Sequence, residues 1–411
     1  MEWFRRAQVA FVFAVLSTSV VPASTGAVTE AEAIRIFLKR SPQARRVPVM
    51  EQTVDAALRV ATRVANPDVA YQVEDAGGVR DEFLTFQQEL PITGRRGLLK
   101  ERAEVAASAA ALGAERGLRG DGYELKRTFH EVLYRQGVLE TFRSGGELLE
   151  RTVEVLEQRE REGEGSGYDV LRAEQELAEL RMSSADADAA LYAARARFGS
   201  FFDPDLNMEA ATLHGGPTPT GPIPEVERAT EDALKQRLDL RSLFAERERL
   251  ELERRAARRR RIPEPVLTVG RKRTEALGLS DTGYVTALTV RLPIFDRGRF
   301  ESARAEAEGQ RIDLDTEILT RRIRAQVQAS VAREQAARNA AERYGENIER
   351  RAVELNEIAR LKYDEGESGI LELLDAQRTS LAMQLRALAV RYEAKVAEIE
   401  RDRAIGNEVE P

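Results

Sequence analysis

The sequence contains no cysteine, and only two of its 411 residues are histidine. Without cysteine, the chain can form no disulfide bond, cannot be lipidated on a mature N-terminal thiol, and cannot hold a metal ion through thiolates. We interpret His130 and His214 as packed or solvated residues rather than as metal ligands. The sequence therefore predicts neither a metal site nor a cofactor.

Aromatic residues are also scarce. They make up 6% of the chain, whereas charged residues make up 32%. Ala, Glu, Arg and Leu dominate, and with helical periodicity this bias favours long helices and coiled-coil packing over a bulky globular core. The formal net charge of −7 gives no overall indication of a nucleic-acid partner.

The N-terminal residues have the pattern of a secretory signal. Arg5 and Arg6 precede an apolar run over residues 9–16, and small residues follow it. This order predicts a signal peptide over residues 1–27 and an exported protein. The run is shorter than the roughly 20 residues that a membrane-spanning helix needs, and we find no later candidate. If this exported protein sits in a membrane, we expect it to do so through β-strands.

Two segments of the chain repeat at one fixed distance. Pro91 and Pro293 each stand in a Leu-Pro-Ile segment, and they lie 202 residues apart. The Ser-Gly pairs at 166–167 and 368–369 have the same separation. Two landmarks with one offset predict a duplicated half. In each half an alternating segment leads into a long helix, through strand-to-helix junctions at Pro91, Gly94, Pro293 and Gly298.

Each half is expected to contain a strand hairpin, a long helix, a tight turn and a return helix. The alternation of Val69, Tyr71 and Val73 is typical of a strand with one apolar face, and each strand has about the ten residues that cross a bilayer when tilted. Leu125 and Val132 continue a seven-residue coiled-coil spacing. The expected domains are two N-terminal periplasmic helices (28–65), a first β-hairpin (66–93), a first long α-hairpin (94–199), a linker and equatorial helix (200–262), a second β-hairpin (263–295), a second long α-hairpin (296–404) and a C-terminal tail (405–411).

Several local features carry expectations of their own. Gly145–Gly146 predicts a kink or swelling in the first long helix. A single helix is predicted over about 225–261, and it ends in four arginines, 258–261. We interpret this run as a basic helix end near lipid head groups rather than as a nucleic-acid site. The second hairpin is expected to have a loop around 278–281, and the chain to end in a polar tail.

Four membrane strands cannot close a barrel, because about eight is the lower limit. Open sheet edges are not tolerated in lipid. Other subunits must therefore complete the sheet, and a dimer would give eight strands whereas a trimer would give twelve. The helical pairs would assemble around the same axis into a tube.

These features resemble the TolC family of outer-membrane efflux proteins. The junctions carry the resemblance together with the segments 166–171 and 363–377, and it covers essentially the whole mature chain in order. The segment 89–96 is most similar to heavy-metal efflux members. The resemblance implies a mainly α fold with a small β part. Duplicated long antiparallel α-hairpins would form a helical barrel, and four strands per chain would complete a shared trimeric 12-stranded β-barrel.

The resemblance also implies the outer-membrane channel of a tripartite efflux system, located in the outer membrane of a Gram-negative bacterium with a large periplasmic portion. The implied partners are two further copies of the chain, a periplasmic adaptor (membrane fusion protein), an inner-membrane pump of the RND type and outer-membrane lipid, with no nucleic acid. The implied pore constriction is Glu372 and Asp375, and the implied gating latch is Tyr363 with Asp169; a latch arginine of some members falls near Ser368 and is missing. The adaptor would dock on the helical tips, at Gly163, Gly165, Ser166, Gly366, Ser368 and Gly369.

No residues point to an enzyme. We find no nucleophile elbow, phosphate loop or metal-spaced cluster, and paired carboxylates are expected by chance in so charged a chain. A periplasmic coiled-coil adaptor or structural protein would explain export and long helices, but not two hairpins of membrane length. Within the channel interpretation, a type I protein-secretion channel is the alternative to efflux, and the substrate could be a metal ion, a drug or a protein.

Overall fold

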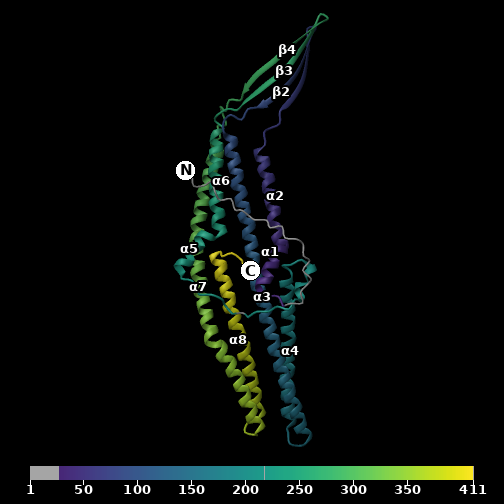
Figure 1. Cartoon of the computed structure of the whole chain (residues 1–411), viewed down its shortest axis with the longest axis vertical. Helices are drawn as coiled ribbons and strands as arrows, with labels where there is room; N and C mark the ends of the chain where they lie inside the picture. Colours follow the sequence, from purple (N-terminus) through teal and green to yellow (C-terminus); the bar gives the residue numbers. More distant parts are fainter. Residues whose placement is uncertain (1–26, 217, 411) are drawn as a thin grey trace.

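The computed structural model describes residues 27–216 and 218–410, and it shows a long, narrow molecule (Figure 1). A small sheet forms one end, and paired helices extend from it to the other end. The expected signal peptide lies outside the described residues, except for its last residue. The elements are, in order, α1 (Glu30–Arg40), α2 (Pro42–Thr62), β1 (Asp68–Ala76), β2 (Val79–Glu89), α3 (Arg95–Arg161), α4 (Gly167–Gly199), the short 3-10 turns η1 (Pro204–Leu206) and η2 (Met208–Ala210), α5 (Val226–Gln236), α6 (Leu238–Arg259), β3 (Pro265–Ala276), β4 (Leu279–Val290), α7 (Arg299–Asp364) and α8 (Ile370–Ile405).

The four strands pair in chain order, each antiparallel to the next. β1 and β2 are joined by Gly77–Gly78, where φ is 62° and 78°, values that glycine adopts without strain. β3 and β4 are joined by Leu277–Gly278. Both predicted hairpins are confirmed. The second turn is tighter than expected, because Ser280 and Asp281 belong to β4 rather than to a loop.

One face of the sheet is apolar, and the strand register shows which residues share it. Val69 lies opposite Phe86, which in turn lies opposite Val269. These side chains are 70%, 43% and 41% exposed, so nothing in the described part of the chain covers them. The opposite face is polar, with an ion pair of 2.7 Å between Lys272 and Asp81. The sheet therefore has an uncovered face that is mainly apolar, with Arg271 and Arg273 toward the far end of β3, and an opposite polar face.

Two helical hairpins, α3 with α4 and α7 with α8, form most of the molecule (Figure 1). The predicted seven-residue spacing is confirmed as packing, since Leu125, Val132 and Leu139 are buried. At 1.5 Å per residue, the 67 residues of α3 give a helix roughly 100 Å long. In the part of the chain that the structure describes, no helix is both long and apolar enough to cross a membrane.

Some glycines of α3 allow close packing. The helix continues through Gly145 and Gly146, and the kink or swelling expected there stays a prediction. A Cβ on Gly145 would lie 3.2 Å from the side chain of Leu381 in α8. At Gly137, a Cβ would similarly lie 3.3 Å from the side chain of Leu388. These glycines therefore let the leucines of α8 come close to the axis of α3.

The prediction of one helix over about 225–261 is wrong, because the structure contains two helices there, α5 and α6. Arg237 between them has an extended backbone, with φ −64° and ψ 121°. Its Nη2 donates to Oδ2 of Asp239 at 2.6 Å, and its Nη1 donates to the carbonyl of Ala404 at 3.2 Å. The break lets the chain change partners, since α5 packs on α7 and α8 whereas α6 packs on α3 and α7.

An apolar core holds the middle of the molecule together. Phe37, Phe129 and Phe198, from α1, α3 and α4, are each at most 1% exposed. The C-terminal tail joins this core, because Val409 is buried against Gly122 of α3. The expected polar tail thus packs on the helices through Val409.

Candidate functional site

The two strand-to-helix junctions are built alike. Gly94 and Gly298 precede α3 and α7, and both have left-handed backbones with φ of 70° and 71°. At Gly298 a side chain would also collide, because a Cβ would lie 2.0 Å from the carbonyl oxygen of Ala257. Pro91 and Pro293 stand shortly before these glycines, just after the strands end. Proline lacks the N–H that would continue the ladder, and glycine then permits the turn into the helix.

The helical hairpins end in two short turns at the far end of the molecule. Gly163 and Gly366 follow α3 and α7 with φ of 79° and 76°. Ser166 caps α4, its hydroxyl accepting a hydrogen bond of 3.2 Å from a backbone N–H of the first turn. Gly165 has no room for a side chain, because a Cβ would lie 2.8 Å from the backbone nitrogen of Glu160.

The second turn differs in its cap, and both tips expose apolar side chains. Gly369 takes the N-cap position of α8, and the hydroxyl of Ser368 is buried without a partner among the described residues. Tyr168, Leu171 and Leu371 are 63%, 67% and 51% exposed. Exposed apolar side chains therefore lie at both tips.

The two hairpins are joined near their tips by a core and an ion pair. Leu177 of α4 and Leu373 of α8 belong to one buried apolar cluster. Beside it, Arg378 binds Glu176 through two parallel hydrogen bonds of 3.0 and 2.5 Å. The sequence analysis missed this pair. The signal that could have found it is its separation of 202 residues, the repeat distance, which places the two residues at equivalent positions of the two halves.

The predicted latch residues lie close to this core. Tyr363 packs partly buried against it, and the guanidinium of Arg159 lies 5.2 Å from the centre of the Tyr363 ring. Asp169 lies in the first turn of α4, where the helix dipole stabilises a carboxylate. Within the described residues of one chain, no hydrogen bond joins Tyr363 to Asp169. The latch between them therefore stays a prediction.

The predicted constriction residues lie on an exposed face of α8. Glu372 and Asp375 are both exposed, and their spacing of three places them on one helix face. Neither forms an ion pair with another described residue. Copies of this face turned toward a common axis would place uncompensated carboxylates around it, and this also stays a prediction.

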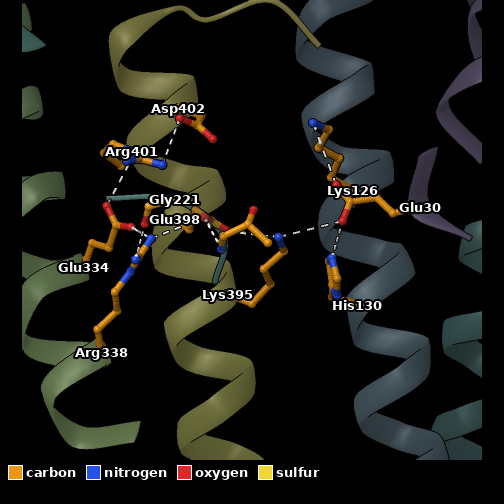
Figure 2. Close-up of polar contacts among 11 residues, drawn as sticks. Glu30, Lys126, His130, Gly221, Glu334, Arg338, Lys395, Glu398, Arg401 and Asp402 are labelled. Atoms are coloured by element: carbon orange, nitrogen blue, oxygen red, sulfur yellow. Dashed lines mark hydrogen bonds and ion pairs between the residues drawn. The ribbon is translucent and has the colours of Figure 1, made fainter. Parts of the chain in front are cut away.

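A buried ionic network lies where the C-terminal part of α8 passes α3 and α7. Figure 2 shows its members pointing toward one another from these helices, from α1 and from the linker. No single stretch of sequence contains it. It comprises Glu30, Lys126, His130, Glu334, Arg338, Lys395, Glu398, Arg401 and Asp402, together with the backbone of Thr220 and Gly221.

The centre of the buried ionic network ties the linker to two helices. Lys395 and Glu398 are 6% and 3% exposed, and Nζ of Lys395 donates to Glu398 at 2.8 Å. Glu398 also accepts from the backbone N–H of Thr220 at 2.7 Å and from Arg338 at 3.2 Å. Arg338 donates in turn to the carbonyl of Gly221 at 2.6 Å. The linker is therefore fastened to both α7 and α8.

The network reaches α1 through Glu30. Nε2 of His130 donates to the Glu30 carboxylate at 2.7 Å, while Lys126 and Lys395 lie 3.7 and 3.8 Å from it. Burial raises the pKa of Glu30, but the hydrogen bond from His130 and the charges of both lysines outweigh burial and lower that pKa to about 2. His130 is thus packed, as predicted, and it also positions a charge.

At the other end, Glu334 is fully buried. Arg338 donates to it at 2.5 Å, and Nε of Arg401 lies 3.4 Å from its second oxygen. Burial raises the pKa of Glu334 above its usual range, because the two arginines offset only part of the desolvation. Arg401 also reaches Asp402 at 3.1 Å. No group of three or more His, Asp or Glu side chains in the described chain could hold a metal ion.

Residues 229–407 match the model of the family described as Outer membrane efflux protein. The chain is 26% identical over 371 residues to the cobalt-zinc-cadmium resistance protein CzcC of Cupriavidus metallidurans. The aligned region covers 86% of this chain and 84% of CzcC. The structure of the outer-membrane channel OprN is similar with a TM-score of 0.77 and 17% identity, over 93% of this chain and 91% of OprN. The outer membrane protein VceC of Vibrio cholerae gives a TM-score of 0.74 and 16% identity, over 93% of this chain and 97% of VceC.

Proposed function

We propose that this chain is an outer membrane efflux protein and that it assembles as a homotrimer into a conduit that crosses the periplasm and the outer membrane. The observation that carries the proposal is the sheet. β1 and β4 each pair on one side only, and the apolar face is uncovered. A sheet with two open edges and an exposed apolar face is stable in lipid only if further strands close it.

The strand length supports a membrane barrel, and the resemblance to the TolC family implies three copies. The strands contain 9 to 12 residues, which matches the length that crosses a bilayer when tilted. Three copies would give a closed sheet of twelve strands, with the apolar face toward lipid and the face of Lys272 and Asp81 toward water. The helical hairpins on one side of the sheet would then surround the same axis (Figure 1).

The tips are proposed as the gate and the docking site. Glu372 and Asp375 of three chains would form an acidic constriction, which favours cations and resists anions. Tyr363 and Asp169 would restrain the hairpins at rest. The exposed tip residues, among them Gly163, Gly165, Ser166, Gly366, Ser368 and Gly369, would receive a periplasmic adaptor. The adaptor would connect the conduit to an inner-membrane pump of the RND type.

The substrate class proposed is divalent metal ions. CzcC is named for resistance to cobalt, zinc and cadmium, and it is similar to this chain over 371 residues. An acidic constriction would attract cations without binding one metal ion tightly. Selectivity among metal ions would then be a property of the pump. A type I protein-secretion channel is less well supported, because no relative reported above is named for secretion.

The experiment is to measure the mass of the detergent-extracted protein by native mass spectrometry and its conductance in a planar bilayer. A homotrimer that conducts ions supports the proposal. A water-soluble monomer that needs no detergent would refute it, and a periplasmic adaptor or structural protein would then be favoured. Metal resistance of cells that carry or lack the gene tests the substrate class separately.

A further inference from the structure

A strongly basic cavity lies where β4 leads into α7 and where α6 ends. It has a volume of about 430 Å³, and we call it the arginine pocket. It lies next to the sheet, on the side of the helices, because α6 leads into β3 and β4 leads into α7. The arginine pocket is lined by Arg258, Arg261, Arg297, Gly298, Arg299, Ser302, Ala303 and Glu306.

The arginine pocket carries more positive charge than the protein neutralises. Four guanidinium groups face one carboxylate, that of Glu306. In the described structure, Arg261, Arg297 and Arg299 form no hydrogen bond or ion pair with the protein. The adjacent Arg260, by contrast, is paired with both Asp296 and Glu301. Unpaired arginines that gather around one cavity are suited to a bound anion.

The other strand-to-helix junction has a smaller basic excess. Its cavity contains Arg63, Arg95 and Arg96, and also the carboxylates of Glu89 and Glu264. Glu264 is further engaged there, since it accepts a hydrogen bond of 2.6 Å from the hydroxyl of Thr93. The large excess of four arginines over one carboxylate is therefore found at the second junction and not at the first.

The side chains around the arginine pocket indicate what kind of anion it meets. Val290 and Leu292 continue the exposed apolar face of β4 down to Ile294, which is 61% exposed. Phe295 and Phe300, directly beside the arginines, are 98% and 83% exposed. Apolar and aromatic side chains above a cluster of arginines match the boundary between acyl chains and head groups.

We infer that the arginine pocket binds the phosphate of an anionic phospholipid in the periplasmic leaflet of the outer membrane, with Phe295 and Phe300 against its acyl chains. This inference rests on the proposed placement of the strands in that membrane. A guanidinium group binds a phosphate through two hydrogen bonds, so three unpaired arginines can hold one head group from several sides. The pocket would supply the chain, which lacks a lipidated cysteine, with a fixed depth in the bilayer.

The test is lipid retention by the purified, detergent-extracted protein, measured by native mass spectrometry. Phosphatidylglycerol is compared with phosphatidylethanolamine, in the presence and absence of excess inorganic phosphate. The variant is Arg261→Gln with Arg297→Gln and Arg299→Gln. The matched control is Arg172→Gln with Arg322→Gln and Arg324→Gln, which also removes three exposed arginines that have no partner in the described structure, far from the sheet.

We expect the unmodified protein and the control to retain phosphatidylglycerol in preference to phosphatidylethanolamine. The pocket variant should retain at most about one tenth as much phosphatidylglycerol as the unmodified protein. A second variant with lysine at the same three positions should be intermediate, because it keeps the charge but not the paired hydrogen bonds. Equal retention by the pocket variant and the control would overturn the inference, and so would binding of inorganic phosphate without preference for the phospholipid. Failure of the unmodified protein to enter any bilayer would instead refute the proposed function.

Discussion

Replacement of Glu398 by alanine should destabilise the protein far more than removal of an exposed charge. Glu398 is 3% exposed and accepts from Lys395, Arg338 and the N–H of Thr220. Without it, the ammonium group of Lys395 remains buried, and its nearest carboxylate is that of Glu30 at 3.8 Å. The variant thus leaves a buried charge and a backbone donor without their main partner.

The magnitude follows from the burial of both partners. Removal of one partner of a buried ion pair typically costs about 3–5 kcal/mol in the free energy of unfolding. For a chain of about 400 residues, the entropy of unfolding is on the order of 0.8 kcal/mol/K, so the melting temperature should fall by about 4–6 °C. The double variant Glu398→Met with Lys395→Met should recover part of this loss, because no uncompensated lysine remains, although Thr220 still lacks its acceptor.

The assay is thermal unfolding of the detergent-extracted protein followed by circular dichroism. Arg321→Ala is the control, because Arg321 and its partner Glu317 are 78% and 57% exposed and such a pair contributes about 0–1 kcal/mol. A Glu398→Ala variant that melts within a degree of the unmodified protein would refute the argument. So would a double variant that is less stable than the single one.

Three further predictions concern the gate and the pH dependence. Glu372→Gln with Asp375→Asn should lower the preference of the channel for cations over anions in a planar bilayer, and an unchanged reversal potential under a salt gradient would exclude these residues from the constriction. Arg378→Ala should raise the resting conductance, because it removes the two hydrogen bonds that hold α8 to α4, whereas Arg322→Ala, with no such contact, should leave it unchanged. The pKa of Glu30 is lowered from 4.5 to about 2, so its contribution to stability is complete above pH 4.5 and is lost as the pH falls toward 2. Glu30→Gln should therefore flatten the dependence of melting temperature on pH in that range, and a slope equal to that of the unmodified protein would contradict this.

The sequence predicts the repeating elements well, because each leaves a periodic pattern. Alternation at Val69, Tyr71 and Val73 indicates which face of the sheet is apolar, and the register confirms it. The spacing of Leu125 and Val132 indicates the buried stripe of α3. These signals are local, since a strand or a helix repeats its environment every two or every three to four residues.

The features that the sequence analysis missed depend on contacts between distant segments. Arg237 ends α5 because it binds Asp239 and the Ala404 carbonyl, and nothing in the helix-forming residues around it indicates a break. Glu30 and Lys395 come together only after folding. In a chain with 32% charged residues, each of them looks like one more solvated side chain.

The continuity of α8 has a mechanical consequence. One uninterrupted helix of 36 residues carries Glu372 near its first turn and Glu398 near its last. A movement of the proposed gate near the start of α8 would therefore be carried along the helix toward its other end. There Lys395 and Glu398 hold α8 in place, so the hairpin would open by turning near these residues or by bending of its helices.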